Sequence, residues 1–275
     1  MKYYECHGHI ALGSGTIEEK LLSLAKAGVI YFRDAGSADG LSNGNEAAMR
    51  SKELGIDFVT PVFALYKEGL YGKFLGKSFS DTKDFYQKLK EAKSLGADYI
   101  KVMYSGIASF KELGKLSCEP LLGKEIKEIV ETCHGEGLAV MAHCNGVDTI
   151  KYAIEYGTDS IEHGIFIDEE GIKMLAASNG KTIWIPTLSA IANEKLALNH
   201  KQAITKAFKE GVVIGTGSDC GCSSVAIESG AITEFDLIQS CLTEAFLEDN
   251  SFSKEKAIDI IEANNKKVVA TFKFR

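Results

Sequence analysis

The chain opens on Met1-Lys2-Tyr3-Tyr4-Glu5-Cys6-His7-Gly8-His9-Ile10, a short strand-like run that ends in two histidines separated by one glycine. Side chains alternate between the two faces of a strand, so both imidazoles project the same way and can reach one metal ion. Gly8 carries no side chain and lets the backbone bend between them. Such a pair also occurs among solvated surface residues, so its meaning depends on what the rest of the chain places nearby.

Length and composition favour one α/β domain. The chain has 275 residues, of which 45% are hydrophobic. A chain of this size buries roughly three quarters of its unfolded surface in one core. We therefore expect a single domain over residues 1–275, a length common among α/β barrels. The formal net charge is −7 and no block of Lys and Arg stands out, which argues against nucleic acid as a partner.

The lack of a recognisable targeting signal and the pattern of cysteines both bear on where in the cell the protein is expected. No apolar run has the length of a membrane helix, and no signal-like pattern opens the chain, so we expect a cytoplasmic protein with no membrane partner. The seven cysteines are odd in number and lack a framework spacing, which predicts reduced thiols. Cys220-Gly221-Cys222 has half the spacing of a zinc knuckle, but no second pair accompanies it, so a loop is favoured.

Apolar runs of strand length alternate with segments of helical period, the pattern of repeated βα units around a parallel sheet. The predicted strands are residues 3–7, 29–34, 58–65, 98–103, 138–143, 160–163, 182–186 and 212–215. A helix follows each strand, the first over 17–27 with Thr16 as its cap, and a further helix over 254–271 reads as a terminal cap. Eight strands, each followed by a helix, predict a (β/α)8 TIM barrel. The long stretch 66–80 is a candidate lid.

Catalytic residues of such barrels lie at the C-terminal ends of the strands. The candidates at those ends are His7, His9, Lys101, His143, His163 and Asp219. Each has a structural alternative when taken alone: a histidine at the barrel rim, a snorkelling or ion-paired lysine, an aspartate that caps a helix. Four of the six histidines at the ends of three strands are hard to explain by chance, so we predict one shared site.

Five motifs carry a family resemblance: His7-Gly8-His9, Tyr99-Ile100-Lys101-Val102-Met103, Val140-Met141-Ala142-His143, Ser160-Ile161-Glu162-His163-Gly164 and Gly215-Thr216-Gly217-Ser218-Asp219. The set resembles the metal-dependent amidohydrolase superfamily. With Arg33-Asp34-Ala35-Gly36, it is similar to the imidazolonepropionase-like and Xaa-Pro dipeptidase (prolidase) branch. Members of that branch usually carry a small β-sandwich built from both chain ends. Here the first ligand strand begins at residue 3 and the chain stops after a helix, so we expect no sandwich.

The resemblance implies a ligand set for one or two divalent ions, with Zn2+ expected. His7, His9 and Asp219 would bind one ion and His143 and His163 the other, while Lys101, carboxylated by CO2, would bridge both. Asp219 would also take a proton from the bridging water and pass it to the leaving group. Imidazole and carboxylate suit such ions, and water bound to them has a pKa of about 7. An ammonium group has no lone pair for a metal, so an unmodified Lys101 would leave a mononuclear site of His7, His9, one later histidine and Asp219.

Other residues are weaker candidates. Tyr104 follows Lys101 and could face the pocket and polarise a substrate carbonyl, and packing at the rim is an equal alternative. Arg33 and Asp34 favour a structural ion pair over substrate binding. We expect His134 to serve a helix C-terminus and His200 to be solvated. Selectivity should lie in the loops 66–80, 104–122 and 220–231, whose polar groups are Lys67, Tyr71, Lys73, Cys222 and Ser223.

We therefore expect a metal-dependent hydrolase that cleaves an amide, imide or other C–N bond of a small molecule with a metal-activated hydroxide. Cyclic amides and dipeptides come first by resemblance. The alternatives are a lactonase or phosphoesterase that uses the same site, and a metal-binding barrel without catalysis. A homo-oligomer is compatible with the sequence.

Overall fold

The computed structural model describes residues 1–38, 41, 44–109, 112, 114–249 and 251–273. Three positions of the predicted loop 104–122 therefore lie outside the described residues. The strands are β1 (Tyr3–Gly8), β2 (Val29–Asp34), β3 (Asp57–Val59), β4 (Ala64–Lys67), β5 (Gly76–Phe79), β6 (Ile100–Met103), β7 (Val140–Cys144), β8 (Ser160–His163) and β9 (Ile183–Ile185). The helices are α1 (Ile17–Lys26), α2 (Gly44–Glu53), α3 (Thr82–Ser94), α4 (Gly123–Gly135), α5 (Val147–Glu155), α6 (Glu169–Ala177), the 3-10 turn η1 (Leu188–Ala190), α7 (Glu194–Lys209), α8 (Gly230–Ala245) and α9 (Lys254–Lys273).

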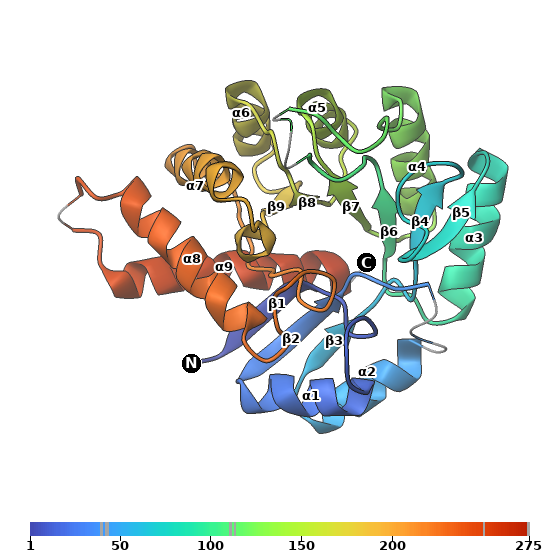
Figure 1. Cartoon of the computed structure of the whole chain (residues 1–275), viewed down its shortest axis with the longest axis horizontal. Coiled ribbons are helices and arrows are strands. Elements are labelled where there is room, and N and C mark those ends of the chain that lie inside the picture. The colour runs from blue at the N-terminus through green and yellow to red at the C-terminus, as the bar shows by residue number, and fades with distance from the viewer. Residues whose placement is uncertain (39–40, 42–43, 110–111, 113, 250, 274–275) are drawn as a thin grey trace.

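All strand pairs are parallel, in two runs ordered β1-β2-β3 and β5-β4-β6-β7-β8-β9. The two runs meet where the Asp98 amide donates to the Thr60 carbonyl at 2.9 Å. Helices α1 to α8 surround the strands, as Figure 1 shows. This is the predicted (β/α)8 architecture, and within the described residues no additional β-sandwich accompanies it.

The barrel closes through the segment 213–220, which lies between β9 and β1. On one side, the Trp184 amide donates to Val213 at 3.1 Å. On the other, the Cys6 amide donates to Thr216 at 2.8 Å and the Asp219 amide donates to the His7 carbonyl at 2.7 Å. The segment therefore takes the place of the eighth predicted strand. It is not a regular strand, because the Thr216 amide donates instead to the side chain of Asn265, at 2.9 Å.

Helix α9 covers one end of the barrel and crosses behind β1 and β2 in Figure 1. Val268 and Phe272 pack into the apolar interior formed by residues of β1, β2, β3, β7 and β9. The Phe272 ring meets Tyr99 edge-on at 5.1 Å. The prediction of a terminal capping helix is confirmed, and because α9 fills this end, the pocket lies at the C-terminal ends of the strands.

The third predicted strand, 58–65, was wrong as one element. It is two strands, β3 and β4, which pair with different partners. Pro61 and Val62 separate them, and Val62 has a φ of 66°, which a regular strand does not allow. The stretch 66–80 is not a simple lid either, because its last part forms β5 beside β4. Thr16 caps α1 as predicted, in a capping box with Glu19.

Among the described residues, no helix combines the length and the apolar character needed to cross a bilayer. All seven cysteines are free thiols, as predicted.

Candidate metal centre

The two histidines of the opening stretch meet Asp219 at the mouth of the barrel. Nε2 of His7 and Nε2 of His9 each lie 3.3 Å from Oδ1 of Asp219, and the three side chains offer ligand atoms within 4.8 Å of one another. His7 is 1% and His9 2% exposed, so both imidazoles are buried, while Asp219 is 15% exposed. Two imidazoles and a carboxylate at this separation suit a divalent transition metal.

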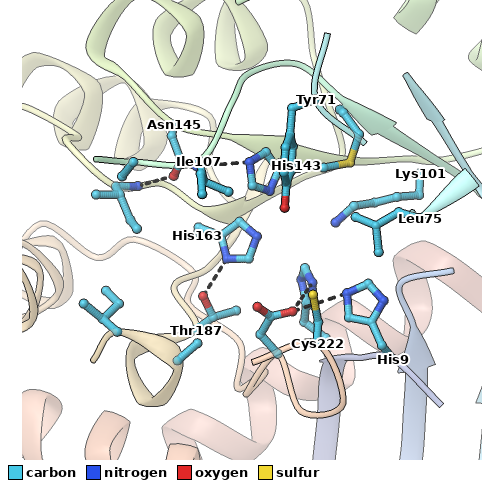
Figure 2. A pocket seen from close by; sticks show the side chains of 17 residues that line it. His9, Tyr71, Leu75, Lys101, Ile107, His143, Asn145, His163, Thr187 and Cys222 are labelled. Carbon is cyan, nitrogen blue, oxygen red and sulfur yellow. Dashed lines mark hydrogen bonds and ion pairs between the residues drawn. The ribbon is translucent and has the colours of Figure 1, made fainter. Parts of the chain in front are cut away.

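A second group faces the first across the same pocket. The His143 and His163 rings lie 4.6 Å apart between centroids, and the His163 ring lies 5.0 Å from that of His7. Lys101 is 1% exposed and lines the pocket with them. Figure 2 shows the Lys101 ammonium group and the imidazoles of His9 and His163 directed toward the centre of the pocket. The structure thus gathers all six predicted side chains in one cavity.

Protein oxygens fix the orientation of the first histidine pair. Nδ1 of His7 donates to Oε2 of Glu162 at 2.6 Å, and Nδ1 of His9 donates to the Gly36 carbonyl at 2.7 Å. In both rings the nitrogen left over is the Nε2 that faces Asp219. An oxygen partner on the distal nitrogen sets the tautomer and raises the basicity of the other, as in metal-ligating histidines.

The second pair is oriented in the same way through other atoms. Nε2 of His143 lies 3.2 Å from the Gly106 carbonyl, and Nδ1 of His163 lies 2.7 Å from Oγ1 of Thr187. Nδ1 of His143 and Nε2 of His163 therefore remain available to a ligand. In each of the four histidine rings, one nitrogen contacts a protein oxygen outside the cluster, which leaves the other for a metal ion, as in metal-ligating histidines.

The electrostatics of the pocket favour ligand forms of these groups. Burial lowers the pKa of His143 to about 3 and that of His163 well below its usual value, so both imidazoles are neutral. Burial also lowers the pKa of Lys101 to about 8. For Asp219, burial opposes ionisation, but the neighbouring imidazoles of His7 and His9 outweigh it and hold the pKa well below its ordinary range.

Three residues of the site have strained backbones. Asp219, His163 and Thr187 adopt left-handed φ values of 57°, 66° and 49°, which cost free energy for any residue with a side chain. His163 is the last residue of β8, Thr187 lies two residues after β9, and Asp219 belongs to the segment 213–220 that closes the barrel. Clustering of such strain around one pocket points to a site at which side-chain placement matters.

A buried ion pair lies beneath the first histidine. The guanidinium of Arg33 donates to both carboxylate oxygens of Glu162, at 2.8 and 3.0 Å, and both side chains are fully buried. Burial acts against the charged Glu162, but Arg33 and His7 lower its pKa to about 2. The prediction that Arg33 pairs with Asp34 was wrong: Asp34 accepts hydrogen bonds from Ile10 and Thr60 instead.

A sequence model of the amidohydrolase family matches residues 12–268, most of the chain and the whole of the described barrel beyond the first histidines. The chain belongs to the amidohydrolase family. Among curated proteins, ochratoxinase from Aspergillus niger is 28% identical over a stretch that covers 54% of this amidohydrolase and 36% of the fungal protein. The match thus spans little more than a third of that relative.

Solved structures confirm the fold. A Xaa-Pro dipeptidase with bound methionine superposes with a TM-score of 0.72 at 18% identity, over 98% of this amidohydrolase and 75% of that chain. A putative prolidase from Bifidobacterium longum gives 0.73 at 20% identity, over 98% and 69%. A. niger ochratoxinase gives 0.71 at 18% identity, over 97% and 71%. Prolidase-like proteins are therefore structural neighbours, as the sequence motifs indicated.

Tyr104 does not reach the pocket of this amidohydrolase, which corrects the suggestion that it polarises a substrate carbonyl. Its side chain is fully buried in the outer core, and its hydroxyl lies 3.3 Å from Oγ1 of Thr158. The tyrosine that lines the pocket is Tyr71, whose ring centroid lies 5.3 Å from that of His143. The loop 66–80 was a predicted source of selectivity, but nothing in the sequence ranked Tyr71 above its neighbours.

The remaining two histidines lie outside the site. His134, on α4 near its C-terminal end, contacts Oδ2 of Asp159 at 2.8 Å. The prediction of a solvated His200 was wrong, because this residue is 3% exposed and its Nε2 contacts the Pro186 carbonyl at 3.0 Å.

Sequence reasoning missed the role of Glu162. It precedes His163 directly, and strand alternation places neighbouring residues on opposite faces. Both nevertheless lie inside the barrel, because the left-handed φ of His163 ends the strand and turns that side chain inward. The motif Ser160-Ile161-Glu162-His163-Gly164, which contains both residues, was the feature of the sequence that could have indicated a role for Glu162.

Proposed function

We propose that this amidohydrolase is a metal-dependent hydrolase that cleaves an amide or related C–N bond of a small molecule. The observation that carries the proposal is the arrangement of four histidines around the partly exposed carboxylate of Asp219, with one nitrogen of each ring held by a protein oxygen outside the cluster. The family membership supports metal dependence, and A. niger ochratoxinase and the prolidase-like structures support the reaction class.

The donor set fits a divalent cation. His7, His9 and Asp219 would hold one ion, His143 and His163 a second, and Lys101 would join the two sets as a carbamate. The lowered pKa of Lys101, about 8, supports this, because only the neutral amine reacts with CO2. A divalent ion bound there supplies Lewis acidity toward the substrate carbonyl and lowers the pKa of water. We propose Zn2+, in a binuclear centre, on the basis of the imidazole-rich donors.

Asp219 is the proposed proton carrier. Its carboxylate is ionised, and it lies at the point where both histidine groups and the pocket meet. It can accept a proton from the attacking water and deliver it to the leaving nitrogen, a transfer that an amide requires because its free amine anion is a poor leaving group. His7 and His9, 3.3 Å from the same oxygen, hold the carboxylate in place for this transfer.

Further proposals concern the whole protein. We propose one hydrolase barrel domain over residues 1–275, a small-molecule substrate, no nucleic acid or membrane partner, and a cytoplasmic location. The net charge of −7 supports the absence of a nucleic-acid partner, and the free cysteines support the cytoplasmic location.

Elemental analysis after gentle purification tests the metal centre. We expect one to two divalent ions per chain, and fewer than about one would refute the site. His163→Asn should lower the metal content, while His134→Gln, a histidine on the outer surface of α4, should retain it as the matched control. A turnover screen of dipeptides, cyclic imides, lactones and phosphoesters then assigns the bond, and activity on lactones or phosphoesters alone would overturn the C–N assignment.

A further inference from the structure

The wall of the pocket is apolar around the histidine cluster. The side chains that form it come from five different loops and strand ends: Leu75, Met103, Ile107, Ile165, Ala190 and Ile191. Leu75 and Met103 are each 3% exposed and Ile165 and Ile191 each 9%. These side chains are packed tightly, and the small surface that they expose to the pocket is apolar. A substrate group placed against this wall loses its contact with water.

Most polar groups in the wall are already engaged. The Asn145 side chain donates to the Gly106 carbonyl at 3.3 Å and accepts from the Ile165 amide at 3.0 Å. Oγ1 of Thr187 is held by His163 at 2.7 Å. Neither side chain is free to bind a substrate without breaking a contact that supports the site itself.

Two polar groups remain, and both are neutral. Figure 2 shows the Tyr71 side chain descending beside His143 with its hydroxyl toward the pocket centre, and Cys222 below it. Among the described residues no hydrogen bond involves the Tyr71 hydroxyl. The ordinary pKa of a phenol is about 10 and that of a thiol about 8.5, so both groups are mainly uncharged at neutral pH. Tyr71 can therefore donate one hydrogen bond to a carbonyl but cannot neutralise an anion.

The described lining contains one lysine or arginine, Lys101. Figure 2 shows its ammonium group directed toward the histidines. Arg33, on β2, is fully buried and bonded to Glu162. Lys67, the last residue of β4, pairs with Glu125. Among the described residues, a substrate carboxylate against the wall would therefore meet no counter-ion, which is strongly unfavourable.

We propose that the pocket binds amides whose group beside the scissile bond is uncharged and apolar, an alkyl or aryl group, and that it selects against a free carboxylate there. The inference rests on the proposed hydrolytic function and narrows its substrate class. Peptide-like substrates with a free carboxyl terminus fall outside it, although dipeptides stood first among the substrates expected from the sequence. Tyr71 is the polar anchor that this wall offers to a neutral substrate.

Three hydroxamates test the proposal by binding to the Zn2+-loaded protein, measured by calorimetry. Acetohydroxamate reports the metal centre alone. Hexanohydroxamate and the monohydroxamate of adipic acid have chains of equal length that end in a methyl and a carboxylate. We expect hexanohydroxamate to bind at least about tenfold more tightly than the adipic compound, and more tightly than acetohydroxamate.

The outcomes separate the two proposals. If acetohydroxamate does not bind, the metal centre and with it the proposed function fail. If it binds but the adipic compound equals or exceeds hexanohydroxamate, the hydrolase proposal stands and the apolar selectivity is refuted. Binding of hexanohydroxamate no tighter than acetohydroxamate also refutes it, because the wall would then contribute nothing.

A charge placed on the wall gives the converse test. Ile107 is 41% exposed at the pocket, so Ile107→Arg can be accommodated. We expect it to lower the preference for hexanohydroxamate over the adipic compound at least about tenfold. Leu198→Arg, on α7 outside the pocket and 56% exposed, is the matched control and should leave the ratio unchanged. An unchanged ratio in the Ile107 variant would refute a carboxylate-excluding wall at this position.

Discussion

Replacement of Glu162 by Gln tests whether the buried ion pair positions the metal ligands. The carboxylate joins Arg33, at 2.8 and 3.0 Å, to Nδ1 of His7 at 2.6 Å, with all three side chains buried. The Glu162→Gln substitution would keep the shape of the side chain but remove the charge that both neighbours face. Two separate quantities should change: the free energy of unfolding of the metal-free protein and the affinity of the metal.

The stability effect follows from the pKa of the carboxyl group. The folded protein lowers the pKa of Glu162 from 4.5 to about 2. At 1.36 kcal/mol per unit this corresponds to roughly 3 kcal/mol, which agrees with the ~3–5 kcal/mol cost of leaving a buried charge without its partner. Because the folded pKa is depressed, this contribution is present above pH 4.5 and is lost as the pH falls toward 2. The difference between wild type and variant should therefore shrink on acidification.

The effect on metal affinity follows from the orientation of His7. Loss of a charged partner on the distal nitrogen costs metal sites about 10–100-fold in affinity. Urea unfolding of the metal-free protein and competition with a chromophoric chelator measure the two quantities. Glu169→Gln, at a carboxylate that is 72% exposed and paired with Lys206, is the matched control and should change neither. A folded Glu162→Gln protein with unchanged metal affinity would refute the positioning argument.

Three further substitutions have defined outcomes. Asp219→Asn should lower kcat/KM at least about 100-fold on an identified substrate while the circular dichroism stays native, and full turnover would remove Asp219 as the proton carrier. Gly8→Ala should destabilise the protein by ~1–3 kcal/mol, seen as a lower Tm, because an added Cβ would lie 2.7 Å from Cζ of Phe32 and 2.8 Å from Sγ of Cys220; an unchanged Tm would contradict this contact. Burial raises the pKa of Glu234 from 4.5 to about 7, so the stability that this group contributes is complete below pH 4.5 and is lost as the pH rises through 7, by roughly 3 kcal/mol in total. Glu234→Gln should flatten that part of the pH profile in urea unfolding, and a profile identical to wild type would show that Glu234 does not titrate there.

Local patterns in the sequence predicted the ligand set because a parallel barrel makes strand ends converge. Once residues 3–7 and 138–143 are strands, the positions of His7 and His143 follow from the fold, wherever the helices lie. The alternation of strand side chains also placed His9 with His7. The resemblance to amidohydrolases added the pairing of these ends with Lys101 and Asp219, and the structure places all six in one pocket.

Contacts between distant segments decided what the sequence missed. The eighth strand position is irregular because the Thr216 amide bonds to Asn265, which is 49 residues away. Gly8 is required for space rather than for flexibility, because Phe32 and Cys220 pack where a Cβ would lie. No local pattern contains either neighbour.

The sequence by itself determined the barrel, the identity of the six pocket residues and the chemistry that they suit, because these depend on periodicity and on residue type. Only the tertiary structure decided which tyrosine faces the pocket, which acid holds His7 and how apolar the wall is. Tyr71 and Tyr104 are alike in sequence terms, but one lies beside His143 and the other is buried against Thr158. Side-chain partners from separate strands and loops fix these features, and such partners meet only after the chain has closed into a barrel.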